Sequence, residues 1–254
     1  MSIAPTAAVL LIGNEVLSGR TKDKNLDFIA DYLTVLGIDL MEARVVSDIE
    51  DDIVAAVNAL RARYTYVFTT GGIGPTHDDI TADAIAKAFG VGISHHPEAS
   101  EILLAYFAQM GREPNEARMR MARVPHGATL ILNAVSKAPG FKMENVHVMA
   151  GVPKIMQAMM DSVAPTLTKG TPVISRTIAF QGGEGDIAAP LKDIQAKYPE
   201  VSIGSYPFES PQGYATNLVL RARDVEKLSA ATDVVILACD GLFKMGKARG
   251  WAEV

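Results

Sequence analysis

The feature that most constrains the fold is a continuous apolar run near the N-terminus, Ala7–Gly13 ("AAVLLIG"). A strand with apolar side chains on both faces has to be covered on both faces, as in a parallel sheet flanked by helices. No basic segment precedes the run, and it is too short to span a bilayer. We therefore interpret it as the first strand of an α/β fold with no membrane segment.

Strand and helix patterns alternate along the following two-thirds of the chain. After a polar loop, apolar residues recur at helical spacing, which predicts a helix: Leu26, Ile29, Leu33 and Leu36. Gly37 then indicates where this helix ends. Ser47 and Glu50 have capping-box spacing, which predicts the start of a second helix. Further strands are predicted over Ile38–Val46, Tyr66–Thr70, Thr129–Leu132 and Val146–Ala150, and further helices over Pro97–Met110, over Pro114–Ala122 and from Pro153. This order predicts βαβ units and a mostly parallel sheet.

A break at "KGTP" (Lys169–Pro172) separates a second pattern. We predict two domains, residues 1–169 and 170–254. In the second, strands are expected in "VISRTIAF", "VSIGSYPF" and "ATNLVLRAR", with helices over Glu184–Lys197 and from Asp224. Helices on an antiparallel or mixed sheet would form a small α+β domain.

Composition excludes several classes of protein. The net charge of -5 argues against nucleic acid as a partner, because duplex binding needs clustered Lys and Arg. The single cysteine, Cys239, lies in an apolar run and excludes an internal disulfide, which favours a cytoplasmic location. The five histidines show no zinc-site spacing, so a zinc hydrolase is not expected.

One loop concentrates residues suited to holding a phosphate, "TTGGIGPTHDDIT" (Thr69–Thr81). Gly71, Gly72 and Gly74 can adopt positive φ and leave room for a ligand against the main chain. Pro75 stiffens the loop. Thr76 has capping-box spacing to the aspartate three residues later, which predicts that a helix starts here. The free amides at such a helix start could bind an anion.

Two neighbouring aspartates, Asp78 and Asp79, conflict with a phosphate unless a divalent cation bridges the charges. The alternative is a glycine-rich turn whose aspartates only cap a helix. His77, in the same loop, could move a proton or bond a ligand oxygen. Spacing alone does not decide between these interpretations, because the loop is neither a Walker A loop nor a dinucleotide fingerprint.

Two other loops follow predicted strands. In "IGNEVLSGRTKDKN" (Ile12–Asn25), Glu15 lies just beyond the first strand, and Asn25 is a natural helix N-cap. Three basic residues there could approach a phosphate, although at least two are expected to be solvated: Arg20, Lys22 and Lys24. The third candidate is "APGF" (Ala138–Phe141) followed by "MAGVPK" (Met149–Lys154), where Pro153 opens a helix.

Taken together, these loops resemble a known family. "GNEVLSGRTKDKN", "TTGGIGPTHDDIT", "REPNEARMRMARVP", "APGF" and "GVP" occur in this order in MoaB/Mog-like molybdopterin-binding domains, above all in CinA (competence/damage-inducible protein A) and FAD synthase. The resemblance covers about residues 5–167 and implies a three-layer α/β/α domain with a mostly parallel sheet. The part after residue 170 resembles the small domain that follows in CinA-like chains.

The resemblance also implies a function. CinA-type domains are associated with metal-dependent cleavage of nucleotide diphosphates such as ADP-ribose, and the FAD synthase relative with cleavage of FAD. Mg²⁺, Mn²⁺ or Co²⁺ would be the cofactor, and a homodimer or homotrimer is expected. The implied catalytic residues are Asp78, Asp79 and Glu15, of which Asp78 and Glu15 would also bind the metal. The implied substrate-binding residues are Gly13, Asn14, Ser18, Gly71, Gly72, Gly74, Pro75, Thr76, Gly140, Gly151 and Pro153.

The sequence departs from the family pattern near the expected ligand. Ser136 and Lys137 replace the usual Gly-Thr before "APGF", and the segment Ala150–Met156 lacks the usual first proline and glutamate. Two alternatives to the pyrophosphatase therefore stay open. One is adenylyl transfer to molybdopterin, and the other is a pterin- or nucleotide-binding protein without catalysis.

Overall fold

The computed structural model describes residues 4–211 and 213–254. The chain divides into two compact units, the first ending at Gly170 and the second covering Thr171–Val254. Each unit has its own apolar core. Within the described part of the chain, no helix combines the length and the apolar composition needed to cross a bilayer.

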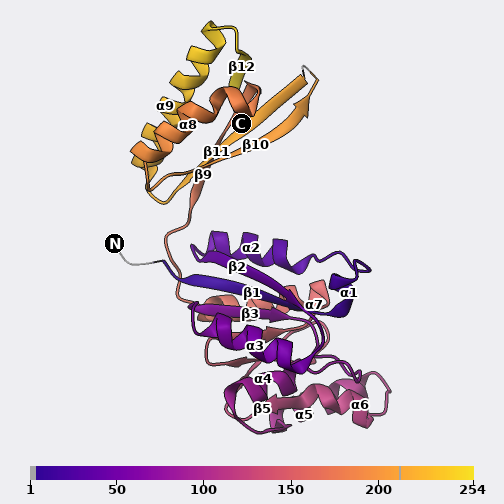
Figure 1. The fold of residues 1–254 in the computed structure, drawn as a ribbon. Helices are drawn as coiled ribbons and strands as arrows, with labels where there is room; N and C mark the ends of the chain where they lie inside the picture. Colours follow the sequence, from indigo (N-terminus) through magenta and orange to yellow (C-terminus); the bar gives the residue numbers. More distant parts are fainter. Residues whose placement is uncertain (1–3, 212) are drawn as a thin grey trace. The chain divides into compact units, whose positions relative to one another are not determined.

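The first unit is built on a six-stranded sheet of order β2-β1-β3-β8-β7-β6, of which Figure 1 labels β2, β1 and β3. Neighbours among the first four strands pair in parallel, and the last two strands pair antiparallel. The strands are β1 (Thr6–Ile12), β2 (Asp39–Val46), β3 (Tyr66–Thr70), β6 (Thr129–Ile131), β7 (Gly140–Met143) and β8 (Val146–Met149). The predicted α/β fold with a mostly parallel sheet is thereby confirmed.

Helices cover both faces of this sheet, and strand β1 shows why. Its alternate residues Ala8, Leu10 and Ile12 enter a core with α3 (Glu50–Arg61) and α4 (Thr81–Phe89). The intervening residues enter the opposite core with α2 (Asn25–Val35) and α7 (Pro153–Val163). Burying one aliphatic side chain contributes about 1.5–3 kcal/mol, so both faces are strongly specified.

Shorter elements complete the first unit. They are α1 (Asn14–Leu17), β4 (Ile93–His95), α5 (Pro97–Gln109), α6 (Glu116–Met119), the 3-10 helix η1 (Arg120–Ala122), β5 (Arg123–Pro125) and η2 (Ala164–Thr166). Strands β4 and β5 form a separate antiparallel pair. These two strands, and strand β7 within the expected "APGF" loop, were not anticipated from the sequence.

The second unit is a four-stranded antiparallel sheet of order β10-β11-β9-β12, with two helices packed on it. The elements are β9 (Ile174–Gly182), α8 (Glu184–Lys197), β10 (Ser202–Ser210), β11 (Gly213–Ala222), α9 (Val225–Lys244) and β12 (Ala248–Glu253). The Asp224 carboxylate caps α9 by accepting bonds from the amides of Glu226 and Lys227. The small α+β domain is confirmed, with β12 as an additional strand. Cys239 is buried in its core, and this burial raises the pKa of the thiol to about 11.

Two predicted helix caps are wrong. Ser47 does not cap α3, which begins at Glu50, because its hydroxyl donates to the Asp52 carboxylate at 2.9 Å. Asn25 does not cap α2, because the Asp23 carboxylate accepts the Leu26 amide at 2.8 Å. At the start of α2 a carboxylate thus accepts the amide in place of Asn25, whereas Ile49, the N-cap residue of α3, forms no side-chain cap.

Candidate functional site

The loops that follow β1, β3 and β8 meet at their main chains. Gly71, directly after β3, has φ +106°, and a Cβ added there would lie 2.1 Å from the Ile12 carbonyl oxygen. A Cβ added to Gly151, in the loop after β8, would lie 3.2 Å from the Gly71 Cα. Strand pairing continues to this point, since the Gly71 amide donates to the Met149 carbonyl at 3.2 Å. Only glycine permits the approach at Gly71, and a Cβ at Gly151 would be closer to its neighbour than an ordinary contact.

Asn25 joins a fourth segment to these loops. Its side-chain amide donates to the Gly151 carbonyl at 2.8 Å, and the residue is only 4% exposed. The bond fixes the first turn of α2 against the Gly151 loop. Sequence reasoning placed Asn25 near the site but assigned it a capping role.

The loop after β1 carries Gly13, Asn14 and Glu15. The Glu15 carboxylate folds over Gly13, whose added Cβ would lie 2.5 Å from both of its oxygens. The Asn14 amide donates to the Asp48 carboxylate at 2.9 Å, so Asp48 holds the start of α1. Ser18, at the other end of α1, is exposed, and its hydroxyl lies 3.4 Å from the Glu15 carbonyl. Sequence reasoning did not identify Asp48, which lies 34 residues from its partner.

The glycine loop is closed by Thr81, the first residue of α4. The Thr81 hydroxyl donates to the Gly71 carbonyl and its amide to the Gly72 carbonyl, both at 3.0 Å. Gly72 has φ +67°, and an added Cβ would lie 2.2 Å from the Thr81 hydroxyl oxygen. The helix therefore starts at Thr81 and not near Thr76, so that prediction is wrong.

Residues Thr76–Asp79 form a tight turn before the helix. The Asp79 carboxylate accepts bonds from the Thr76 amide at 2.8 Å and from the Thr76 hydroxyl at 2.5 Å, and the Asp79 amide donates back to the Thr76 carbonyl at 3.2 Å. Gly74 passes under the same carboxylate, since its added Cβ would lie 2.6 Å from Asp79 Oδ2. The capping-box residues thus stabilise a turn, which leaves Pro75 exposed.

Asp78 differs from Asp79 in facing solvent, with a side-chain exposure of 62%. Hydrogen bonding by the Thr76 side chain, followed by its own backbone amide, lowers the pKa of the Asp78 carboxyl. The His77 ring lies 4.0 Å from this carboxylate and is almost fully exposed. Asp78 is therefore an ionised, accessible carboxylate beside the glycine loop.

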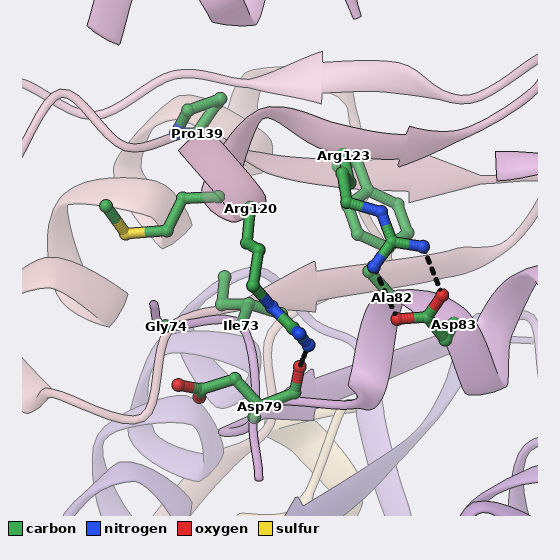
Figure 2. Close-up of a pocket in the computed structure, with 11 residues that line it drawn as sticks. Ile73, Gly74, Asp79, Ala82, Asp83, Arg120, Arg123 and Pro139 are labelled. Atoms are coloured by element: carbon green, nitrogen blue, oxygen red, sulfur yellow. Dashed lines mark hydrogen bonds and ion pairs between the residues drawn. The ribbon is translucent and has the colours of Figure 1, made fainter. Parts of the chain in front are cut away.

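Two arginines from a distant part of the sequence reach the glycine loop and the first turn of α4 (Figure 2). The Arg123 guanidinium binds both carboxylate oxygens of Asp83, at 2.6 and 3.0 Å. Arg120, in η1, donates to the Asp79 carbonyl at 3.4 Å. Sequence reasoning missed both, because "REPNEARMRMARVP" has no local pattern that places it near residues 72–83.

The arginines and the loop enclose a small pocket of about 20 Å³, enough for one water molecule. It is lined by Gly72, Ile73, Gly74, Asp79, Ala82, Asp83, Arg120, Met121, Arg123, Pro139 and Phe141. Gly140, between the last two of these, lies in the sheet, where an added Cβ would be 2.3 Å from the Val148 carbonyl oxygen. The neighbours of Gly140 therefore line the pocket, whereas Gly140 allows β7 to pack.

The remaining predicted positions lie around these loops without forming a preassembled metal site. Pro153 is the first residue of α7, directly after the Gly151 loop. Among the residues that the structure describes, no group of three or more His, Cys, Asp or Glu side chains is arranged to hold a metal ion. Asp78 and Glu15 could therefore contribute to a cation site only together with ligand oxygens or water.

The fold and these glycine-lined strand ends define an α/β domain of the type that binds small ligands at the carboxyl edge of its sheet. Residues 8–169 match the family model described as a probable molybdopterin binding domain. The chain belongs to this molybdopterin-binding-domain family, which confirms the MoaB/Mog-like resemblance. Residues 172–239 match the model of the FAD synthase middle domain.

Individual relatives support the CinA-like resemblance. A protein of Pyrobaculum calidifontis is 35% identical over 80% of this chain and 81% of its own length. A CinA-like protein of Desulfosudis oleivorans is 36% identical over 78% of this chain, a match that spans 47% of that protein. The crystal structure of the protein CinA, of unknown function, from Thermoplasma acidophilum is 32% identical and covers 64% of this chain and 98% of its own, with a TM-score of 0.59.

Proposed function

We propose that the first unit is a divalent-metal-dependent pyrophosphatase that cleaves a nucleotide diphosphate such as ADP-ribose or FAD. The observation that supports this most directly is the meeting of the Gly71 and Gly151 main chains at the start of the loop that also carries the exposed carboxylate of Asp78. Glycines allow phosphates to approach the backbone closely, and a carboxylate can orient water for attack.

In this proposal the main chain around Gly71–Gly74 positions the diphosphate. Asp78 accepts a hydrogen bond from the attacking water and orients it toward phosphorus. Asp79 holds the turn through Thr76 and so keeps its neighbour Asp78 in place. Positioning and charge stabilisation supply most of the rate enhancement in phosphoryl chemistry.

In this proposal a Mg²⁺-type ion is shared with the substrate. Such ions are usually held by one or two carboxylates together with phosphate oxygens and water. Asp78 and Glu15 would hold the ion. When bound, it would neutralise charge on the phosphate oxygens.

The test is hydrolysis of a nucleotide panel by the purified chain with Mg²⁺, Mn²⁺ or Co²⁺. We expect AMP from ADP-ribose or FAD, and at least a hundredfold loss of kcat in Asp78→Asn, in the range of a lost acid-base group. Asp31→Asn, an exposed aspartate in α2, is the control and should retain activity. The proposal fails if no diphosphate is cleaved with any metal while Asp78→Asn leaves nucleotide binding unchanged.

A second candidate function is the binding of a pterin, with or without adenylyl transfer. The family description as a molybdopterin binding domain favours it. A thermal shift with molybdopterin but no hydrolysis of diphosphates would support binding, and ATP consumption only in the presence of the pterin would support transfer. A cytoplasmic location and a dimeric or trimeric assembly stay predictions, which fractionation and light scattering can test.

A further inference from the structure

The two arginines of the pocket differ in how their charges are balanced. The charge of Arg123 is neutralised by a bidentate ion pair with Asp83. Arg120 makes one long bond, 3.4 Å, to a neutral carbonyl oxygen of Asp79. No carboxylate forms an ion pair with Arg120 among the described residues.

Arg120 is partly buried and lines the pocket. Its backbone is also well fixed, because it belongs to η1, whose last residue, Ala122, accepts the His96 amide at 2.8 Å. A guanidinium carries five N–H donors, so one long bond to a neutral carbonyl oxygen leaves donors of Arg120 available to an anion.

The position of Arg120 indicates which anion could approach. The residue lines the same pocket as Gly72 and Gly74, opposite the main chain of the glycine loop (Figure 2). The pocket is now too small for a phosphate, but the weak bond to the Asp79 carbonyl can be exchanged for a stronger one. A guanidinium bonds a phosphate through two parallel N–H groups with a geometry that a carbonyl oxygen cannot match.

We propose that Arg120 is a phosphate-binding residue, which leaves the Asp79 carbonyl and holds one phosphoryl group of a diphosphate against the glycine loop. The inference deepens the proposed function by naming a recognition residue, yet binding can be tested without turnover. It also names the selectivity: a diphosphate is bound more tightly than a nucleoside that lacks phosphate.

The competing explanation is that Arg120 is a structural strap that steadies the turn through the Asp79 carbonyl. Arg120→Gln separates the two roles, because glutamine can still donate to a carbonyl oxygen but has no charge. Arg120→Lys keeps the charge without the planar fork. Arg112→Gln, an exposed arginine before α6, is the matched control.

The experiment is calorimetric titration of the full chain with inorganic pyrophosphate, ADP-ribose and adenosine, with and without Mg²⁺. We expect Arg120→Gln and Arg120→Ala to weaken pyrophosphate binding about 10- to 100-fold, as for a lost charge-assisted bond. Arg120→Lys should recover part of this loss, and Arg112→Gln should match the wild type. Urea unfolding should show little change in Arg120→Gln.

The inference is overturned if the wild type does not bind pyrophosphate, or if Arg120→Gln binds it within twofold of the wild type. If ADP-ribose is cleaved equally by wild type and Arg120→Gln, the proposed function stands and the role of Arg120 fails. If nothing is cleaved but Arg120→Gln lowers pyrophosphate affinity, the role of Arg120 stands and the proposed hydrolysis fails.

Discussion

The same dipeptide, Gly-Gly, lies at the end of a strand in both units and has a different role in each. Gly71 and Gly72 follow β3 with φ of +106° and +67°, and the helix begins only at Thr81. Gly182 ends β9, Gly183 has φ -72°, and α8 begins immediately afterwards at Glu184. The first pair forms a loop and the second pair forms a direct strand-to-helix junction.

The surroundings explain the difference. A Cβ on Gly71 would meet backbone of a neighbouring parallel strand, the Ile12 carbonyl. A Cβ on Gly182 would meet the ring of Phe180, on its own strand, at 2.5 Å. Parallel strands end together, so their loops converge, whereas the neighbours of β9 are antiparallel and end at the opposite edge. Sheet direction thus decides whether a glycine pair helps to build a site.

The largest expected effect is that of Gly71→Ala. The new Cβ meets an immobile carbonyl and adopts a positive φ, so we expect about 4 kcal/mol of destabilisation, from strain and overpacking together. Amide exchange in β1 and β3 measures the effect. Gly90→Ala is the control, because it has φ +66° with no atom within 4 Å and should cost only about 1 kcal/mol. Equal costs would contradict the importance of the close approach.

Acid should destabilise the first unit more than the second, because all five histidines lie in the first unit. Burial in β8, followed by the charge of Lys142, lowers the pKa of His147 to about 4 from an ordinary 6.5. As the pH falls from 6.5 toward 4, His147 is protonated in the unfolded state but not in the folded state. The free energy of unfolding of the first unit therefore falls by on the order of 3 kcal/mol over that range. This stability is fully present above pH 6.5.

His147→Phe should abolish that part of the pH dependence, as followed by amide exchange in β8 between pH 6.5 and 4. Trp251 is the single tryptophan, and its fluorescence reports the second unit alone. Unfolding of the second unit should not respond to the substitution. A pH profile unchanged by His147→Phe would show that His147 is not the group responsible.

Gly182→Ala should cost less than Gly71→Ala, about 2 kcal/mol, because Gly182 has no positive φ and its added Cβ meets a side chain and not the backbone. Trp251 pairs with Phe180 across β12 and β9, so tryptophan fluorescence in urea measures this loss directly. A cost above that of Gly71→Ala would reverse the comparison between the two glycine pairs.

The smallest expected effect concerns two buried threonines. Thr81→Val removes the bond to the Gly71 carbonyl and leaves that acceptor unpaired, at a cost of about 1–2 kcal/mol. Thr232→Val removes a bond to the Leu228 carbonyl, which already accepts a helical bond, and should cost less than about 1 kcal/mol. Urea unfolding of both variants measures the difference, and equal costs would argue against a special role of Thr81 in closing the loop.

The elements that sequence predicts well are those with long apolar patterns. The run in β1 predicts burial on both faces because every residue of Ala7–Ile12 is apolar. Strand β7 was not predicted because it is short and begins at Gly140, a residue type that usually indicates a loop. Glycine is needed there because a Cβ would collide with a carbonyl oxygen of the neighbouring strand. The caps of α2 and α3 were misassigned because the side chains bond elsewhere: Asp23 accepts the Leu26 amide, and the Ser47 hydroxyl donates to Asp52.

The site follows the same rule. The glycine loop was predictable because its residues are contiguous, and the parallel sheet predicts that the loop after β8 lies nearby. Arg120 was not predictable, because its approach to Asp79 depends on the packing of η1, 41 residues away. The sequence also could not predict that Asp78 is exposed while Asp79 holds the turn, because the two aspartates are neighbours in one polar stretch.

The close approach of Gly71 and Gly151, together with the bond from Asn25, makes the arrangement of the loops independent of most side chains around them. The loops are held by main-chain atoms and one buried amide, so side chains at the rim can change without moving the frame. Relatives could therefore exchange ligands while keeping the same backbone arrangement. Substrate preference would then vary at positions such as 136–137, 152 and 154 much faster than at the glycines.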